Sequence, residues 1–96
     1  MENQLDLLKF NEQVILNLDV SDDKIFKVIL ALECILEFES YKAFDSIKLC
    51  KYINIPFEDI DSYFDILINN NILIKTETNS AFLSLYKLNL DYGYEL

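Results

Sequence analysis

Apolar residues recur at helical spacing in three stretches of the chain, and this pattern predicts helices over residues 22–39, 45–53 and 56–69. Acidic residues at the start of the first stretch suit the positive end of a helix. Asp45 can cap the second helix through its side chain. Pro56 suits the first turn of the third, where its missing N–H costs nothing. The chain therefore has a helical centre.

Alternation with a period of two marks the two ends of the chain instead. Residues 13–20 alternate as a strand would, whereas residues 2–10 fit either a short helix or a loose arm. A C-terminal hairpin is predicted over 72–90, followed by a short tail at 91–96. The expected fold is a single α+β domain over residues 1–96, with three helices, a C-terminal β-hairpin and an extra strand or arm in residues 1–20.

Composition limits the chemistry that this chain can perform. The 96 residues include one Gly and one Pro, about half are apolar, and neither His nor Arg occurs. Without His the chain lacks the usual general base and the usual zinc ligand. We therefore expect a non-catalytic protein with no cofactor and no metal. Cys34 and Cys50 lie in apolar runs without C-x-x-C spacing, which favours small core residues over a redox pair or a metal site.

Targeting signals are not visible in the sequence. The N-terminus carries no basic segment of the kind that opens a signal peptide. No uncharged run is longer than nine residues, the length of the run from Ile66 to Ile74, whereas a membrane-spanning helix needs about 20. These features predict a soluble, cytoplasmic protein without a membrane partner.

A resemblance to a known family covers residues 23–90. Leu49-Cys50-Lys51-Tyr52-Ile53-Asn54-Ile55 looks like the second helix and turn of the winged helix-turn-helix family, with Cys50 in the small-residue position. Ile60, Phe64 and Leu67 fall where that family buries its third helix. Residues 67–73 resemble the helix end that leads into the wing, with Asn71 where Gly is usual. The resemblance implies DNA binding, with the third helix in the major groove.

The charge of the third helix argues against that role. Acidic and small polar residues occupy its outward positions, namely Glu58, Asp59, Asp61, Ser62, Asp65 and Asn69, and no Lys lies in residues 52–74. The whole chain has 8 Lys and 17 acidic residues, a net charge of −9. Phosphates would be repelled by such a surface, because neutralisation by Lys or Arg supplies most non-specific affinity for nucleic acid.

The prediction is therefore that the third helix binds a basic surface on another protein. The chain would act either as an adaptor or as a nucleic-acid mimic that inhibits a DNA- or RNA-binding machine, as small acidic phage-encoded inhibitors do. The alternative is a DNA-binding transcription regulator, whose contacts would come from the lysines at the second helix and the hairpin, Lys48, Lys51, Lys75 and Lys87.

Self-association is a further expectation. Leu30 and Cys34 fall in an otherwise polar sector of the first predicted helix, so the N-terminal segment or a second copy of the chain should cover them. We expect a homodimer through residues 1–20 and that helix, because two-fold dimers are the commonest oligomers. The candidate interface residues are Val14, Leu16, Leu18, Phe26, Leu30 and Cys34.

Overall fold

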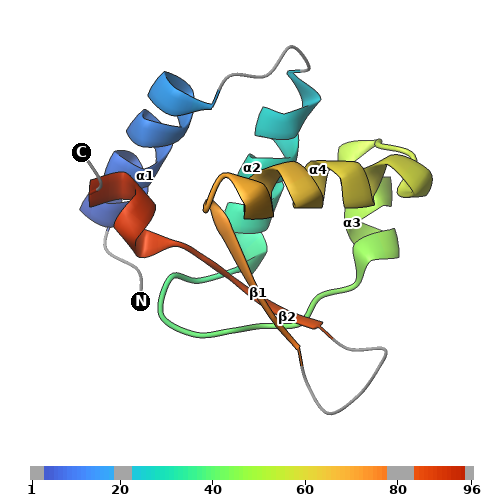
Figure 1. Cartoon of the computed structure of the whole chain (residues 1–96). Coiled ribbons are helices and arrows are strands. Elements are labelled where there is room, and N and C mark those ends of the chain that lie inside the picture. The colour runs from blue at the N-terminus through green and yellow to red at the C-terminus, as the bar shows by residue number, and fades with distance from the viewer. Residues whose placement is uncertain (1–3, 19–22, 78–83, 95–96) are drawn as a thin grey trace.

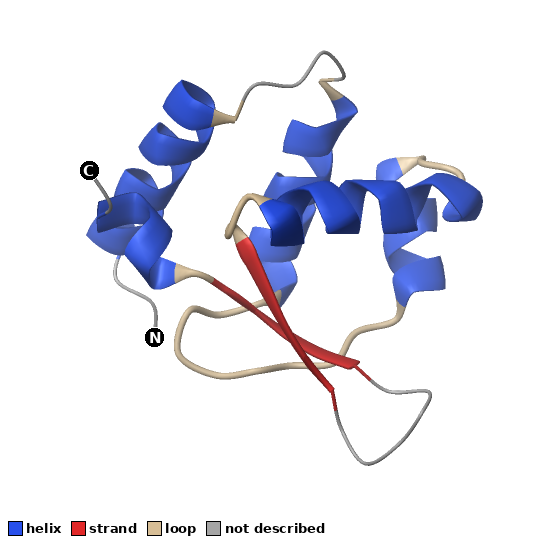
Figure 2. Cartoon of the chain, viewed as in Figure 1, coloured by secondary structure: helices blue, strands red, loops and turns tan. Residues whose placement is uncertain are grey.

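The described residues form four α-helices, one antiparallel pair of strands and one 3₁₀ helix. The computed structural model describes residues 4–18, 23–77 and 84–94. In chain order the elements are α1 (Gln4–Asn17), α2 (Lys24–Ile35), α3 (Ser46–Ile53), α4 (Phe57–Asn69), β1 (Leu73–Glu77), β2 (Ser84–Leu88) and the 3₁₀ helix η1 (Leu90–Tyr94) (Figures 1 and 2). The layout is α+β, as expected, and is consistent with a winged-helix-like arrangement. No helix among the described residues is long and apolar enough to cross a bilayer.

The prediction of a strand over residues 13–20 is wrong. Residues 4–17 form α1 instead, and Phe10, Val14 and Leu18 bury one side of this segment at a spacing of four residues. Two of these positions, Val14 and Leu18, also belong to an alternating pattern, which is why the period of two misled the prediction. Residues 19 and 20 of the predicted strand lie outside the described residues.

The described part of the C-terminal tail packs against α1. Residues 90–94 form η1, which lies beside α1 (Figure 1). The ring of Phe10 packs edge-on against Tyr92 of η1 and against Phe38, with centroids 5.9 and 5.3 Å apart. The hydroxyl of Tyr94 donates a hydrogen bond to Asp6 on α1. α1 and η1 therefore stabilise each other.

The first predicted helix ends earlier than expected, at Ile35 rather than 39. Leu36 has extended backbone angles (φ −100°, ψ 164°), and Leu36 and Phe38 both turn into the core. The chain there runs along β2, because the N–H of Leu88 donates to the carbonyl of Glu37 over 3.0 Å. Pairing with the hairpin thus replaces the last turn of the helix.

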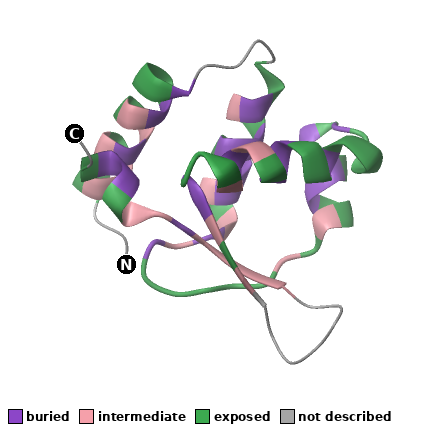
Figure 3. Cartoon of the chain, in the orientation of Figure 1, coloured by how far each residue is buried: buried purple, intermediate pink, exposed green. Residues whose placement is uncertain are grey.

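The hairpin closes the core from below α4 in the view of Figure 1. β1 and β2 pair antiparallel, with Leu73 opposite Leu88, both buried. Lys42 adds an isolated bridge to Tyr86, so the link between α2 and α3 runs beside β2. The rings of Phe44, Phe64 and Tyr86 then meet with centroids 5.3–5.7 Å apart. Figure 3 shows the buried residues on the inward sides of the helices.

Candidate binding surfaces

The local sequence determines where α4 begins and ends and which of its sides is buried. Pro56 precedes its first residue, and Glu58 and Asp59 lie in the first turn, where acidic side chains favour the helix dipole. Its buried residues are Ile60, Tyr63, Phe64 and Leu67. After the helix, Asn71 takes a left-handed conformation (φ 62°), which Asn tolerates better than other side chains that have a Cβ. This turn leads the chain directly into β1.

The opposite side of α4 carries the residues that the sequence singled out. Glu58, Asp59, Asp61, Ser62, Asp65 and Asn69 are all exposed, and we call this set the acidic face of α4. Its four carboxylates form no ion pair with any described residue. All eight lysines of the chain are described, and none of them forms an ion pair with this face.

Asp61 also affects the pKa of a thiol on α3. The Cys50 thiol lies on α3 and is buried, and its pKa is raised by that burial and, secondly, by the negative charge of Asp61. Cys50 is a core residue as expected, and its raised pKa keeps it in the unreactive thiol form.

The lysines of the alternative DNA-binding interface do not form one patch. Lys48 and Lys51 are exposed on α3. On the hairpin, Lys75 pairs with Tyr86 and Lys87 pairs with Ile74. Since side chains alternate along a strand, Lys75 and Lys87 point to opposite faces of the hairpin. The Nζ of Lys87 lies over the ring of Tyr41, 4.9 Å from its centre.

The structure corrects part of the proposed dimer interface. Val14 and Leu18 pack in the core of the chain itself and are only 2 and 7 % exposed, so they offer little surface to a second copy. Cys34 is exposed, and the interpretation of it as a core residue is wrong. Leu16 and Leu30 are exposed, and Phe26 is partly buried. Although α1 lies beside α2, it leaves Leu30 uncovered.

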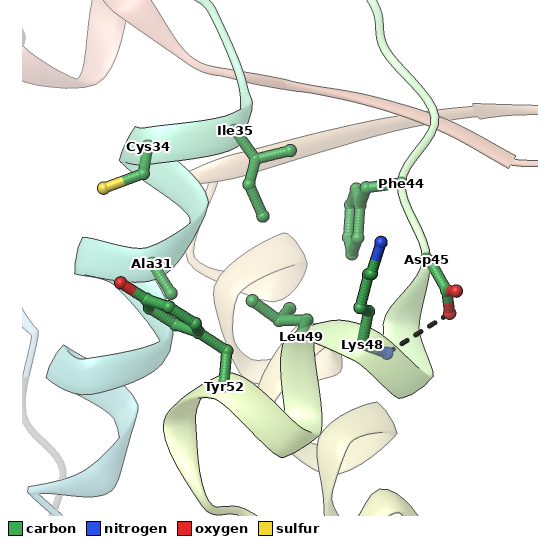
Figure 4. A pocket seen from close by; sticks show the side chains of 8 residues that line it. All are labelled: Ala31, Cys34, Ile35, Phe44, Asp45, Lys48, Leu49 and Tyr52. Atoms are coloured by element: carbon green, nitrogen blue, oxygen red, sulfur yellow. Dashed lines mark hydrogen bonds between the residues drawn. The ribbon is translucent and has the colours of Figure 1, made fainter.

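A groove between α2 and α3 was not predicted from the sequence. It has a volume of about 440 Å³, and its lining is Ala31, Cys34, Ile35, Phe44, Asp45, Lys48, Leu49 and Tyr52 (Figure 4). Asp45 caps α3 by accepting from the amides of Ile47 (3.0 Å) and Lys48 (3.3 Å). The sequence held no clear signal for this groove, because its apolar residues fit an ordinary core; only the structure shows that Tyr52 is 87 % exposed.

A second groove lies between α1 and α2. Its volume is about 470 Å³, and it is lined by Asn11, Val14, Ile15, Phe26, Ile29 and Leu30. At its edge the side chain of Asn11 donates to the Oε1 of Glu33 over 3.2 Å. Burial raises the pKa of the Glu33 carboxyl, and the hydrogen bond from Asn11 offsets part of that rise. The groove itself is therefore apolar, with one partly buried acid beside it.

No protein-family model, curated protein or solved structure matches this chain.

Proposed function

We propose that this chain is a non-catalytic binding protein that uses the acidic face of α4 to contact a basic surface on another protein. The observation that carries the proposal is the exposure of all four carboxylates of that face without an ion-pair partner among the described residues. Acids in the first turn have a local benefit through the helix dipole. Asp61 and Asp65 have none, because like charges four residues apart on a helix repel each other.

The spacing of these charges supports contact with a partner that binds polyanions. At 100° per residue, Glu58, Asp61 and Asp65 fall within an arc of about 60° on the helix, and they span about 10 Å along its axis. Successive phosphates on one strand of DNA are about 3.4 Å apart along the axis, so three of them span about 7 Å. The three carboxylates therefore present charge on a similar scale, although at a lower density.

The finer proposal is a nucleic-acid mimic on a winged-helix frame. In that family α4 would correspond to the helix that enters the major groove, so its carboxylates would take the position of phosphates towards a DNA- or RNA-binding protein. An adaptor that binds a basic partner without inhibiting it would use the same face. DNA binding by the chain itself is the alternative, and the opposite orientation of Lys75 and Lys87 disfavours it.

The test is charge reversal on α4 with a matched control. The partner is first isolated by affinity capture from the native host, and its dissociation constant is measured by titration calorimetry. Asp61→Lys/Asp65→Lys should abolish binding. The control Glu39→Lys/Asp91→Lys makes the same change in net charge at exposed sites outside α4 and should bind much more tightly than the α4 variant. Equal affinities for the two variants would contradict the proposal.

A mobility-shift assay separates the alternative. Wild-type protein is titrated against duplex DNA in about 50 mM salt, where phosphate contacts are strongest. We expect no shifted band. A salt-sensitive shift that is lost in Lys48→Glu/Lys51→Glu would instead support DNA binding through α3.

A further inference from the structure

The outer face of α1 is apolar although it points away from the core. Its members are Leu5, Leu8, Glu12, Ile15 and Leu16, and the four apolar side chains are 53, 55, 70 and 75 % exposed in that order. On the opposite side of the same helix, Phe10 and Val14 are almost completely buried. An ordinary surface helix has one apolar side, whereas α1 has two.

Contacts on the inner side prevent α1 from turning its outer face inwards. Gly93 of η1 lies against the backbone of Lys9 and Phe10. The ring of Phe10 is held between Phe38 and Tyr92. The outer face of α1 is thus presented to solvent in a fixed orientation.

The spacing on this face is that of a helix-pairing seam. Leu5, Leu8, Glu12 and Ile15 are separated by three, four and three residues, which is the alternation of the core positions in a helix pair. Lys9 and Leu16 flank the seam on the same side as Leu5. Neither Lys9 nor Glu12 forms an ion pair within the described part of the chain.

A two-fold axis across the middle of α1 makes this face complementary to itself. In an antiparallel pair, residues whose numbers have nearly the same sum lie near each other across the axis. A pair centred near residue 11 brings Leu5 close to Leu16 of the partner subunit and, slightly offset, Leu8 close to Ile15 of the partner subunit. The same register places Lys9 against Glu12 of the partner subunit. In each apolar pair both members lie on the same side of the seam, as two-fold symmetry requires.

We propose that the chain forms a homodimer through an antiparallel pairing of the outer faces of α1. Each copy contributes the same apolar side chains. Lys9 of each copy pairs with Glu12 of the partner subunit, so the interface contains two equivalent ion pairs. Ile15 also lines the groove beside Leu30, so the interface continues from α1 onto α2 and covers Leu30. A membrane surface fits less well, because the chain has a net charge of −9 and anionic headgroups would repel it. The inference rests on α1 and does not depend on the function proposed for α4.

The first experiment measures mass against concentration. Sedimentation equilibrium of the full chain, from about 1 to 200 µM, should show a mass that rises from 11.3 kDa towards twice that value. Leu8→Gln/Ile15→Gln should weaken the association at least tenfold. The control Ile47→Gln alters an α3 side chain that is as exposed as Leu8, at 55 %, and should leave the mass profile unchanged. A mass of 11.3 kDa throughout would overturn the proposal.

A charge swap tests the register of the pair. Lys9→Glu and Glu12→Lys should each weaken the dimer several-fold at low salt, because each variant brings like charges together across the axis. The double variant Lys9→Glu/Glu12→Lys should recover most of the lost affinity. Circular dichroism of every variant checks that α1 still folds. Failure of the double variant to recover affinity, with folding intact, would refute this pairing, as would a chain that stays monomeric and co-floats with phosphatidylcholine vesicles.

Discussion

Gly93 is the only glycine of the chain, and it lies where η1 meets α1. A Cβ built on Gly93 would come 2.7 Å from the backbone nitrogen of Phe10 and 3.0 Å from both the carbonyl carbon of Lys9 and the Cα of Phe10. All three contacts are with backbone atoms, so no side chain can rotate away. Gly93→Ala should therefore force the backbones of η1 and α1 apart.

The sign of the effect makes this substitution informative. Gly93 does not have a positive φ, and at such positions Gly→Ala ordinarily stabilises a protein by about 0.4–1 kcal/mol through the unfolded state. Ordinary contact begins near 3.4 Å, so the backbones must separate by about 0.7 Å, the difference between 3.4 and 2.7 Å. Such overpacking costs about 1–3 kcal/mol. The net expectation is a loss of about 1–2 kcal/mol in the free energy of unfolding.

Urea unfolding followed by circular dichroism measures this loss directly. At about 4–8 °C per kcal/mol for a domain of this size, the melting temperature should fall by about 4–16 °C. Asp91→Ala, an exposed substitution in the same helix, serves as the control and should change the unfolding free energy by less than about 0.5 kcal/mol. If Gly93→Ala proves as stable as wild type or more so, η1 does not pack on α1 as described.

Substitutions at three further positions test local features of the fold. Asp45→Ala removes the acceptor for two α3 amides and should lower the unfolding free energy by about 1 kcal/mol in urea titrations; an unchanged midpoint would contradict the cap. Asn71 has a φ of 62°, so Asn71→Ala should lower the free energy of unfolding by about 1–2 kcal/mol, whereas Asn71→Gly should leave it unchanged or raise it. Equal melting temperatures for the two variants would contradict a left-handed conformation at this position. Glu33 has a pKa raised above 4.5 by burial, so its carboxyl holds a proton more tightly in the folded state, and its contribution to stability is complete at low pH and is lost as pH rises through the raised pKa. Glu33→Gln should therefore be more stable than wild type at pH 7 but not at pH 3, in thermal melts across that range.

Elements defined by local chemistry could be predicted from the sequence. The cap residue Asp45 and the break at Pro56 bound α3 and α4, because each acts on backbone groups a few residues away. The exposed side of α4 followed in the same way, since the buried positions of an amphipathic helix determine its opposite face. The turn at Asn71 was visible because few other side chains adopt its conformation.

Other features depended on contacts between distant segments. Val14 and Leu18 fit both a strand and a helix, and the choice fell to α1 because Phe10 meets Phe38 and Tyr92. The early end of α2 depended on pairing with β2, more than 45 residues further along the chain. The orientation of Lys75 and Lys87 depended on the hairpin register.

The sequence by itself determined the helical centre of this protein, the hairpin that follows it and the acidic surface of α4, because capping, periodicity and charge are properties of neighbouring residues. Only the tertiary structure decided that the first residues form a helix and that this helix leaves Leu8, Ile15 and Leu16 in solvent. The physical reason is that an apolar residue gains from burial against any apolar partner. The sequence shows which residues are apolar and would gain from burial. Only the folded chain shows which of them are buried and which remain exposed.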